Sequence, residues 1–188
     1  RKEETRNRIV VAAGKGIREH GYGGIGVDGI AKEAGVTSGA IYSHFGSKDN
    51  VFEASVSAGI KDFVEGVYFW RESKGDKWLN PFIDWYMSAE QRKNIAEGCA
   101  VPGLSADVAR AGDNVHQAYE AQMLDLVEAI TDGLPSGTKT ARKKVAWSLL
   151  ATLGGGVMMA RAVDNEKIST EIATAARQTA KKLVSGLG

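Results

Sequence analysis

Residues 27–48 read VDGIAKEAGVTSGAIYSHFGSK, and this stretch has the pattern of two short helices joined by a tight turn. Alanines on the inner face of the first helix let a second helix cross it at close range. Gly35 is free to adopt the left-handed conformation that such a turn requires. On the second helix, Ile41 and Phe45 form one buried stripe and leave the opposite side exposed. The stretch therefore predicts a helix-turn-helix.

The residues left on the outer surface of the second helix are small or able to form hydrogen bonds. Thr37 and Ser38 stand at the N-terminus of that helix, where they reach phosphates or base edges of DNA. Lys48, in the first turn of the next helix, adds a positive charge for a phosphate. The candidate DNA contacts are Thr37, Ser38, Gly39, Ala40, Tyr42, Ser43, His44 and Lys48. The alternative is two packed helices with an ordinary polar surface.

Helical periodicity extends over the rest of the chain, so the predicted fold class is all-α. Ile9, Ala13 and Ile17 lie four residues apart and mark the apolar face of a first helix that ends at Gly21. A long helix is expected from the Ser47 cap to about residue 70. Later helices are expected from Asn80-Pro81, near 105–109, and over 113–133, 138–163 and 169–187.

Charge and the long helix together predict two functional parts. Residues 1–48 hold eight basic and five acidic residues, a net charge of +3, whereas residues 49–188 hold sixteen and eighteen, a net charge of −2. The N-terminal part is therefore the better binding surface for a polyanion. We expect a three-helix DNA-binding domain over 1–48, continuing into a linking helix to about residue 70. A helical ligand-binding and dimerisation bundle is expected over 71–188.

The N-terminal motifs resemble those of the TetR/AcrR family of transcriptional regulators. They are Arg8-Ile9, Ala12-Ala13, Gly21-Tyr22, Ile30-Ala31, Ala34-Gly35-Val36-Thr37, Gly39-Ala40-Ile41-Tyr42, His44-Phe45 and Ser47-Lys48. The resemblance implies an all-helical homodimer whose recognition helix runs from about Ser38 to Phe45. It also implies DNA contacts at Thr37, Ser38, Tyr42, His44 and Lys48. One position departs from the family, because Gly26 stands where a Ser or Thr is usual.

The C-terminal half is rich in aromatic and sulfur side chains that would suit an apolar effector pocket. The candidate pocket residues are Trp85, Tyr86, Cys99, His116, Tyr119, Met123 and Trp147. The alternative is that these residues fill the core. The pocket as a whole is implied by the resemblance and not by the pattern of residues.

The last two long helices are the candidates for pairing two copies of the chain. Three successive glycines at 154–156 cost the helix about 1 kcal/mol each against alanine, which favours close approach by another backbone. The candidate interface residues are Leu149, Leu153, Gly156, Val157, Ala160, Ile172, Ala176 and Leu183. Paired across a two-fold axis, the two helices of each copy would form a four-helix bundle. The alternative is that one stripe packs only within its own subunit.

Other signals in the sequence exclude several classes of protein. Cys99 is the one cysteine, so no disulfide forms within the chain, which is consistent with the cytoplasm. The GxGxxG at 21–26 follows a helix and not a strand, which argues against a dinucleotide site. The three histidines are scattered, so we expect no metal and no cofactor. No apolar run approaches the roughly 20 residues of a membrane helix. No catalytic constellation is present, so we expect no enzyme.

The expected function is a DNA-binding transcriptional regulator, a repressor released from a palindromic operator by a small apolar or amphipathic effector. Its partners would be the duplex operator, the effector and a second copy of the chain. One alternative is an activator, or a DNA-binding dimer that needs no effector. Another is a helical enzyme or carrier of small molecules with an N-terminal helix pair.

Overall fold

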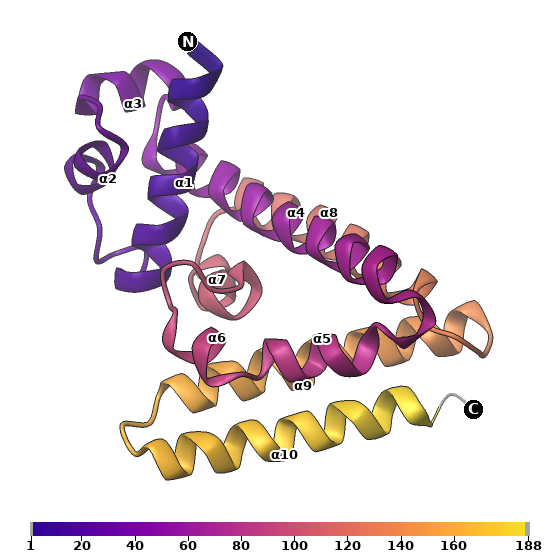
Figure 1. Cartoon of the computed structure of the whole chain (residues 1–188). Helices are drawn as coiled ribbons and strands as arrows, with labels where there is room; N and C mark the ends of the chain where they lie inside the picture. Colours follow the sequence, from indigo (N-terminus) through magenta and orange to yellow (C-terminus); the bar gives the residue numbers. More distant parts are fainter. Residues whose placement is uncertain (1, 187–188) are drawn as a thin grey trace. The chain divides into compact units, whose positions relative to one another are not determined.

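The computed structural model describes residues 2–186, and over that range the chain is built from helices without a strand (Figure 1). The predicted all-α class is confirmed. The helices are α1 Lys2–His20, α2 Val27–Ala34, α3 Ser38–Phe45, α4 Lys48–Lys74, the 3-10 turn η1 Gly75–Lys77, α5 Leu79–Tyr86, α6 Ala89–Lys93, α7 Ala100–Val108, α8 Asp113–Asp132, α9 Lys139–Arg161 and α10 Glu166–Ser185. Among the residues described, no helix is both long and apolar enough to span a membrane.

The helices form two compact units that alternate along the chain. Unit 1 contains the chain up to Asp62 together with Ile95–Met123, and unit 2 contains Phe63–Asn94 together with the chain from Leu124 onward. Helices α4 and α8 therefore each contribute residues to both units. The predicted division into a DNA-binding part and an effector-binding part at about residue 70 is a division by function. It stays a prediction.

In unit 1, helices α1 to α3 surround a small apolar core (Figure 1). The predicted face of α1 is confirmed, since Ile9, Ala13 and Ile17 are at most 1% exposed. On α4, the buried Ser55 hydroxyl donates to the Val10 carbonyl oxygen over 3.1 Å and to the Val51 carbonyl oxygen over 2.8 Å. The first turns of α4 are thereby fixed against α1.

In unit 2, α10 packs along α9 (Figure 1), and an aromatic cluster gathers around Phe82 of α5. The ring centroid of Phe82 lies between 5.4 and 6.3 Å from those of Phe63, Trp70, Trp78, Trp85 and Tyr86. The indole N–H of Trp78 donates to the Gly133 carbonyl oxygen over 2.9 Å, which satisfies the polar atom of a buried side chain.

Several helix boundaries differ from the sequence-based prediction. Asn80 was expected to cap α5, but the cap is Trp78 and Pro81 lies inside the first turn, where its missing N–H costs nothing. Helix α7 begins at Ala100 instead of near Ser105, again with a proline in its first turn. Helix α6 was not predicted. Helix α10 ends at Ser185, and the predicted end at residue 187 lies outside the described residues.

Candidate nucleic-acid interface

The turn between α2 and α3 has the geometry that the sequence predicts. Gly35 is left-handed, with φ 64° and ψ 41°. Its N–H donates to the Lys32 carbonyl oxygen over 3.1 Å, and the N–H of Val36 donates to the Ala31 carbonyl oxygen over 2.9 Å. These bonds close the last turn of α2 and start α3 at a defined angle. The predicted helix-turn-helix is confirmed as a structural element.

The N-terminus of α3 is fixed by two side chains. The hydroxyl oxygen of Thr37 accepts the N–H of Ala40 at 3.2 Å, so Thr37 is the N-cap. The hydroxyl of Ser38 donates to the carboxylate of Asp28 on α2. Since Ser38 is a candidate DNA contact, Asp28 holds its hydroxyl in place and competes with DNA for its hydrogen. Asp28 is not among the residues predicted from the sequence to act at this site.

Helix α3 has one buried and one exposed face, as predicted. Ile41 is 0% exposed and Phe45 is 8% exposed, whereas Tyr42 on the other side is 54% exposed. The other candidate DNA contacts on or next to α3 differ in how far they are exposed to solvent. Thr37, Gly39 and Ser43 are exposed, and Ser38, Ala40 and His44 are partly exposed. A partner could therefore meet all of them.

Lys48 begins α4 and is held by Tyr22 of the turn between α1 and α2. The Lys48 ammonium donates to the Tyr22 carbonyl oxygen over 2.5 Å and lies 4.1 Å from the centre of the Tyr22 ring. The Tyr22 hydroxyl donates to the carboxylate of Asp49. Partial burial, followed by this hydrogen bond and the negative charge of Asp49, raises the pKa of Tyr22 to about 12.

Two arginines of α1 also lie beside the helix-turn-helix, and the sequence analysis did not assign them to the interface. The guanidinium of Arg6 lies 4.9 Å from the ring centre of Phe45. Arg8 approaches the turn, where a Cβ added to Gly35 would lie 3.7 Å from an Arg8 nitrogen. Both arginine side chains are exposed. Their charge was visible in the sequence, but their position next to α3 depends on how α1 crosses it.

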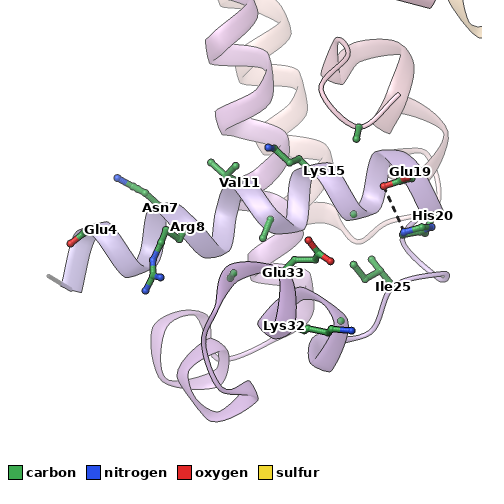
Figure 2. A pocket seen from close by; sticks show the side chains of 15 residues that line it. Glu4, Asn7, Arg8, Val11, Lys15, Glu19, His20, Ile25, Lys32 and Glu33 are labelled. Atoms are coloured by element: carbon green, nitrogen blue, oxygen red, sulfur yellow. Dashed lines mark ion pairs between the residues drawn. The ribbon is translucent and has the colours of Figure 1, made fainter. Parts of the chain in front are cut away.

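A groove of about 1090 Å³ lies between α1 and α2 on unit 1 (Figure 2). Val11 and Ile25 contribute apolar surface, whereas Lys15, Lys32 and Glu33 contribute charge from both sides. None of the candidate effector residues lines this groove. Sites for small apolar ligands are mostly lined by hydrophobic and aromatic side chains, and no phenylalanine, tyrosine or tryptophan is among the residues that line this groove.

The candidate effector residues belong to both units and differ in burial. Cys99, His116, Tyr119 and Met123 belong to unit 1, and Trp85, Tyr86 and Trp147 belong to unit 2. Tyr86 and Met123 are buried, Cys99 and Tyr119 are half-buried, and Trp85, His116 and Trp147 are exposed. Tyr119 has a polar partner, because its hydroxyl oxygen lies 2.8 Å from that of Ser105. Their assignment to an effector site stays a prediction.

The candidate interface residues of α9 face inward within the single chain. Leu149, Leu153, Gly156, Val157 and Ala160 are all buried, and Ile172, Ala176 and Leu183 of α10 are partly exposed. A Cβ added to Gly156 would lie 2.6 Å from the Ala176 Cβ, so the close approach that the glycines predicted occurs between α9 and α10 of one chain. Their assignment to an interface between two copies stays a prediction.

Among residues 2–186, no group of three or more histidine, cysteine, aspartate or glutamate side chains is arranged to hold a metal ion.

Comparison with known proteins identifies the helix-turn-helix. Residues 9–55 match the family described as bacterial regulatory proteins, tetR family. An HTH-type transcriptional regulator of Lactococcus lactis is 25% identical over 162 residues, which cover 82% of each chain. The HTH-type transcriptional activator FasR of Mycolicibacterium smegmatis is 33% identical over 66 residues, 35% of this chain and 30% of FasR.

Solved structures extend the similarity of fold to nearly the whole chain. A TetR-family transcriptional regulator from Cytophaga hutchinsonii superposes with a TM-score of 0.79 at 16% identity, covering 99% of this chain and 96% of the other. At that identity the superposition establishes a shared fold. The shared fold includes both units, whereas the family match lies on α1 to α3 and the first turns of α4.

Proposed function

Because this chain is a transcriptional regulator of the TetR family, we propose that it is a dimeric repressor of a near-palindromic operator, released by a small effector. The family is one of regulators and not of enzymes. The observation that carries the proposal is the exposed face of α3. On that face Tyr42 is 54% exposed, whereas the neighbouring Ile41 is fully buried.

In this proposal, α3 enters the major groove with its N-terminus toward the base edges. Thr37 and Ser38 lie at that end, and the lack of bulk at Gly39 and Ala40 brings the backbone close to the groove. Tyr42, His44 and Lys48 bind phosphates, which sets the register of α3 and makes affinity dependent on salt. Two copies would place two such helices about one turn of DNA apart.

Pairing of two copies is proposed through the outward surfaces of α9 and α10. Met158 and Met159 of α9 are 43% and 61% exposed, and Ile168 of α10 is 46% exposed. Exposed apolar side chains on neighbouring helices favour burial against a second copy. A symmetric pair would bury the same surface of each protomer.

The effector is proposed to be apolar or amphipathic and to bind among the aromatic side chains assigned from the sequence. Its effect on DNA would be a coupling free energy between two sites, so DNA should weaken effector binding by the same factor. Helix α4 carries Lys48 at its start and continues into unit 2, which supports it as the connecting element. The cytoplasm is the proposed location, because the chromosome is there.

A second candidate function is transcriptional activation. FasR, described as an activator, is 33% identical over the 66 matching residues. DNA binding by the helix-turn-helix is common to both functions, since the sign of regulation depends on where the operator lies relative to the promoter. Transcription in vitro from a template that contains the operator distinguishes a repressor from an activator, because added protein lowers transcription only for a repressor.

The test of the proposed function begins with selection of DNA fragments from sheared genomic DNA of the source bacterium. We expect recovery of a short inverted repeat. Tyr42→Ala and Lys48→Ala should each weaken binding to the recovered duplex. Loss of the Lys48 contact should also reduce the slope of log affinity against log salt by about 0.9.

Matched controls come from the exposed residues of α4. Tyr68→Ala and Lys61→Ala remove the same side chains at positions outside the proposed interface and should leave the affinity unchanged. Equal losses in the control and interface variants would refute the assignment of α3 and Lys48. If no sequence is recovered above background, the proposal that this chain binds a specific operator is refuted.

A further inference from the structure

Tyr22 connects three parts of unit 1 through its backbone and its side chain. Its N–H donates to the Asp107 carboxylate on α7 over 3.1 Å. Its carbonyl oxygen accepts the Lys48 ammonium, and its hydroxyl donates to Asp49. Its ring packs against Phe52, with centroids 5.0 Å apart. The position of Lys48 therefore depends on how the turn containing Tyr22 is held.

Asp107 is well placed to hold that turn. Gly21, immediately before Tyr22, is left-handed with φ 76°, and its N–H donates to the Ile17 carbonyl oxygen at the end of α1. A Cβ added to Gly21 would lie 3.9 Å from the same Asp107 oxygen that accepts the Tyr22 N–H. A carboxylate bonded to a backbone N–H forms a charge-assisted hydrogen bond, which is stronger than a neutral one.

Further contacts anchor the C-terminal turns of α1 to the segment that leads into α7. The Arg18 side chain donates to the Ala96 carbonyl oxygen over 2.8 Å and lies against Gly103 of α7, and Lys15 forms an ion pair with Glu97. These contacts hold α1 itself, whereas the contact of Asp107 is with the turn between α1 and α2. The segment 95–108 thus supports the end of α1, and Asp107 extends that support to Tyr22.

We propose that Asp107, on α7, is a positioning residue for DNA binding that holds the turn of Tyr22 so that Lys48 is presented to a phosphate. The inference rests on the proposed function, because it concerns the same DNA contact. An ammonium group has three donors. One is used by the Tyr22 carbonyl oxygen, and the others are available to phosphate oxygens. Asp107 lies 59 positions beyond Lys48 in the chain, outside the helix-turn-helix.

Removing Asp107 has two effects on the affinity for DNA, and they act in opposite directions. The direction of the measured change therefore shows which effect is larger. Loss of a negative charge by itself raises affinity for a polyanion. Loss of the positioning hydrogen bond lowers affinity, because the Tyr22 turn then no longer presents Lys48 to the phosphate and that contact is lost. We therefore expect Asp107→Ala to weaken binding by about tenfold, the size of one hydrogen bond to a charged group.

The experiment measures affinity against salt concentration for the full chain, with the duplex recovered by genomic selection as the probe. Asp107→Ala should reduce the salt slope by about 0.9, as Lys48→Ala does. The double variant should bind no more weakly than Lys48→Ala alone, because both changes remove one contact. Asp107→Asn retains an acceptor oxygen and should restore both affinity and slope.

Asp125→Ala is the matched control, since it removes the charge of an exposed aspartate on α8. If Asp107→Ala behaves like this control, the inference is overturned. It is also overturned if Asp107→Ala and Lys48→Ala have additive effects while the salt slope is kept, because Asp107 would then act only on stability. Asp107→Leu replaces Asp107→Ala if circular dichroism shows loss of helix. Absence of any salt-dependent binding by the unaltered chain would instead refute the proposed function, and the inference with it.

Discussion

Gly26 is the residue at which this chain departs from the family pattern, and the structure gives that departure a physical meaning. It caps α2 in an extended conformation, with φ −89° and ψ 171°, and no side chain bonds to the free N–H groups of the first turn. Space is available, because a Cβ added there would have no neighbour within 4 Å. A hydroxyl at this position would therefore fit without rearrangement.

Gly26→Ser should stabilise the chain by on the order of a few tenths of a kcal/mol, because serine caps a helix slightly better than glycine does. It should also tighten operator binding about two- to tenfold by donating to a phosphate. Urea unfolding and fluorescence anisotropy measure the two effects. Gly23→Ser is the control, since Gly23 is equally open but caps no helix. A similar gain in affinity in both variants would contradict the prediction.

Tyr22 should ionise well above the range of an ordinary tyrosine, because its pKa is raised to about 12. The raised pKa means that the folded chain favours the neutral phenol. The resulting stabilisation is fully present below about pH 10 and is lost as pH rises from 10 toward 12. Tyr22→Phe should therefore remove a step near pH 12 from the tyrosinate absorbance titration. It should also reduce the pH dependence of unfolding between pH 10 and 12. An unchanged titration would show that Tyr22 ionises like an ordinary tyrosine.

Among the elements, the pairing of α9 with α10 depends on a single glycine of the triple-glycine segment. Gly156 faces Ala176 and Met87, whereas a Cβ added to Gly154 would have no neighbour within 4 Å. The same substitution should therefore have different effects at two positions that are two residues apart.

Gly154→Ala should stabilise the chain by about 1 kcal/mol through helix propensity. Gly156→Ala should be less stable than Gly154→Ala by about 1–3 kcal/mol, because the new methyl group forces α9 and α10 apart. Urea unfolding at matched protein concentration measures the difference. Equal stability of the two variants would show that α10 moves away from α9 without cost.

At the scale of the whole molecule, the predicted homodimer requires an outward apolar surface. Met158 is 43% exposed on α9, and its replacement by glutamate would place a charge on that surface. Met158→Glu should convert the dimer to monomers and make thermal unfolding independent of protein concentration.

Sedimentation equilibrium measures the mass of the variant against a control at an equally apolar position. Phe69→Glu introduces the same charge on α4, where the side chain is 66% exposed, and it should leave the dimer intact. Dissociation by Phe69→Glu and not by Met158→Glu would move the interface to α4.

The predictions from sequence succeed where the determining interactions are local. The left-handed Gly35, the Thr37 cap and the buried pair on α3 all follow from residues within a few positions of one another. The cap of α5 was predicted at Asn80 and lies at Trp78, because the buried indole binds Gly133, a residue 55 positions away. Long-range packing shifts a helix end that local capping rules alone place elsewhere.

The sequence by itself determined the all-helical class, the helix-turn-helix and the set of side chains on the outer face of α3. Helical periodicity and turn conformation are encoded over short separations, so one sequence suffices to read them. Only the tertiary structure decided that α9 uses Gly156 against its own α10, and that Lys48 is held by Tyr22 and, through it, by Asp107. These contacts join residues 20, 26 and 85 positions apart, because folding brings together groups whose proximity no local pattern records.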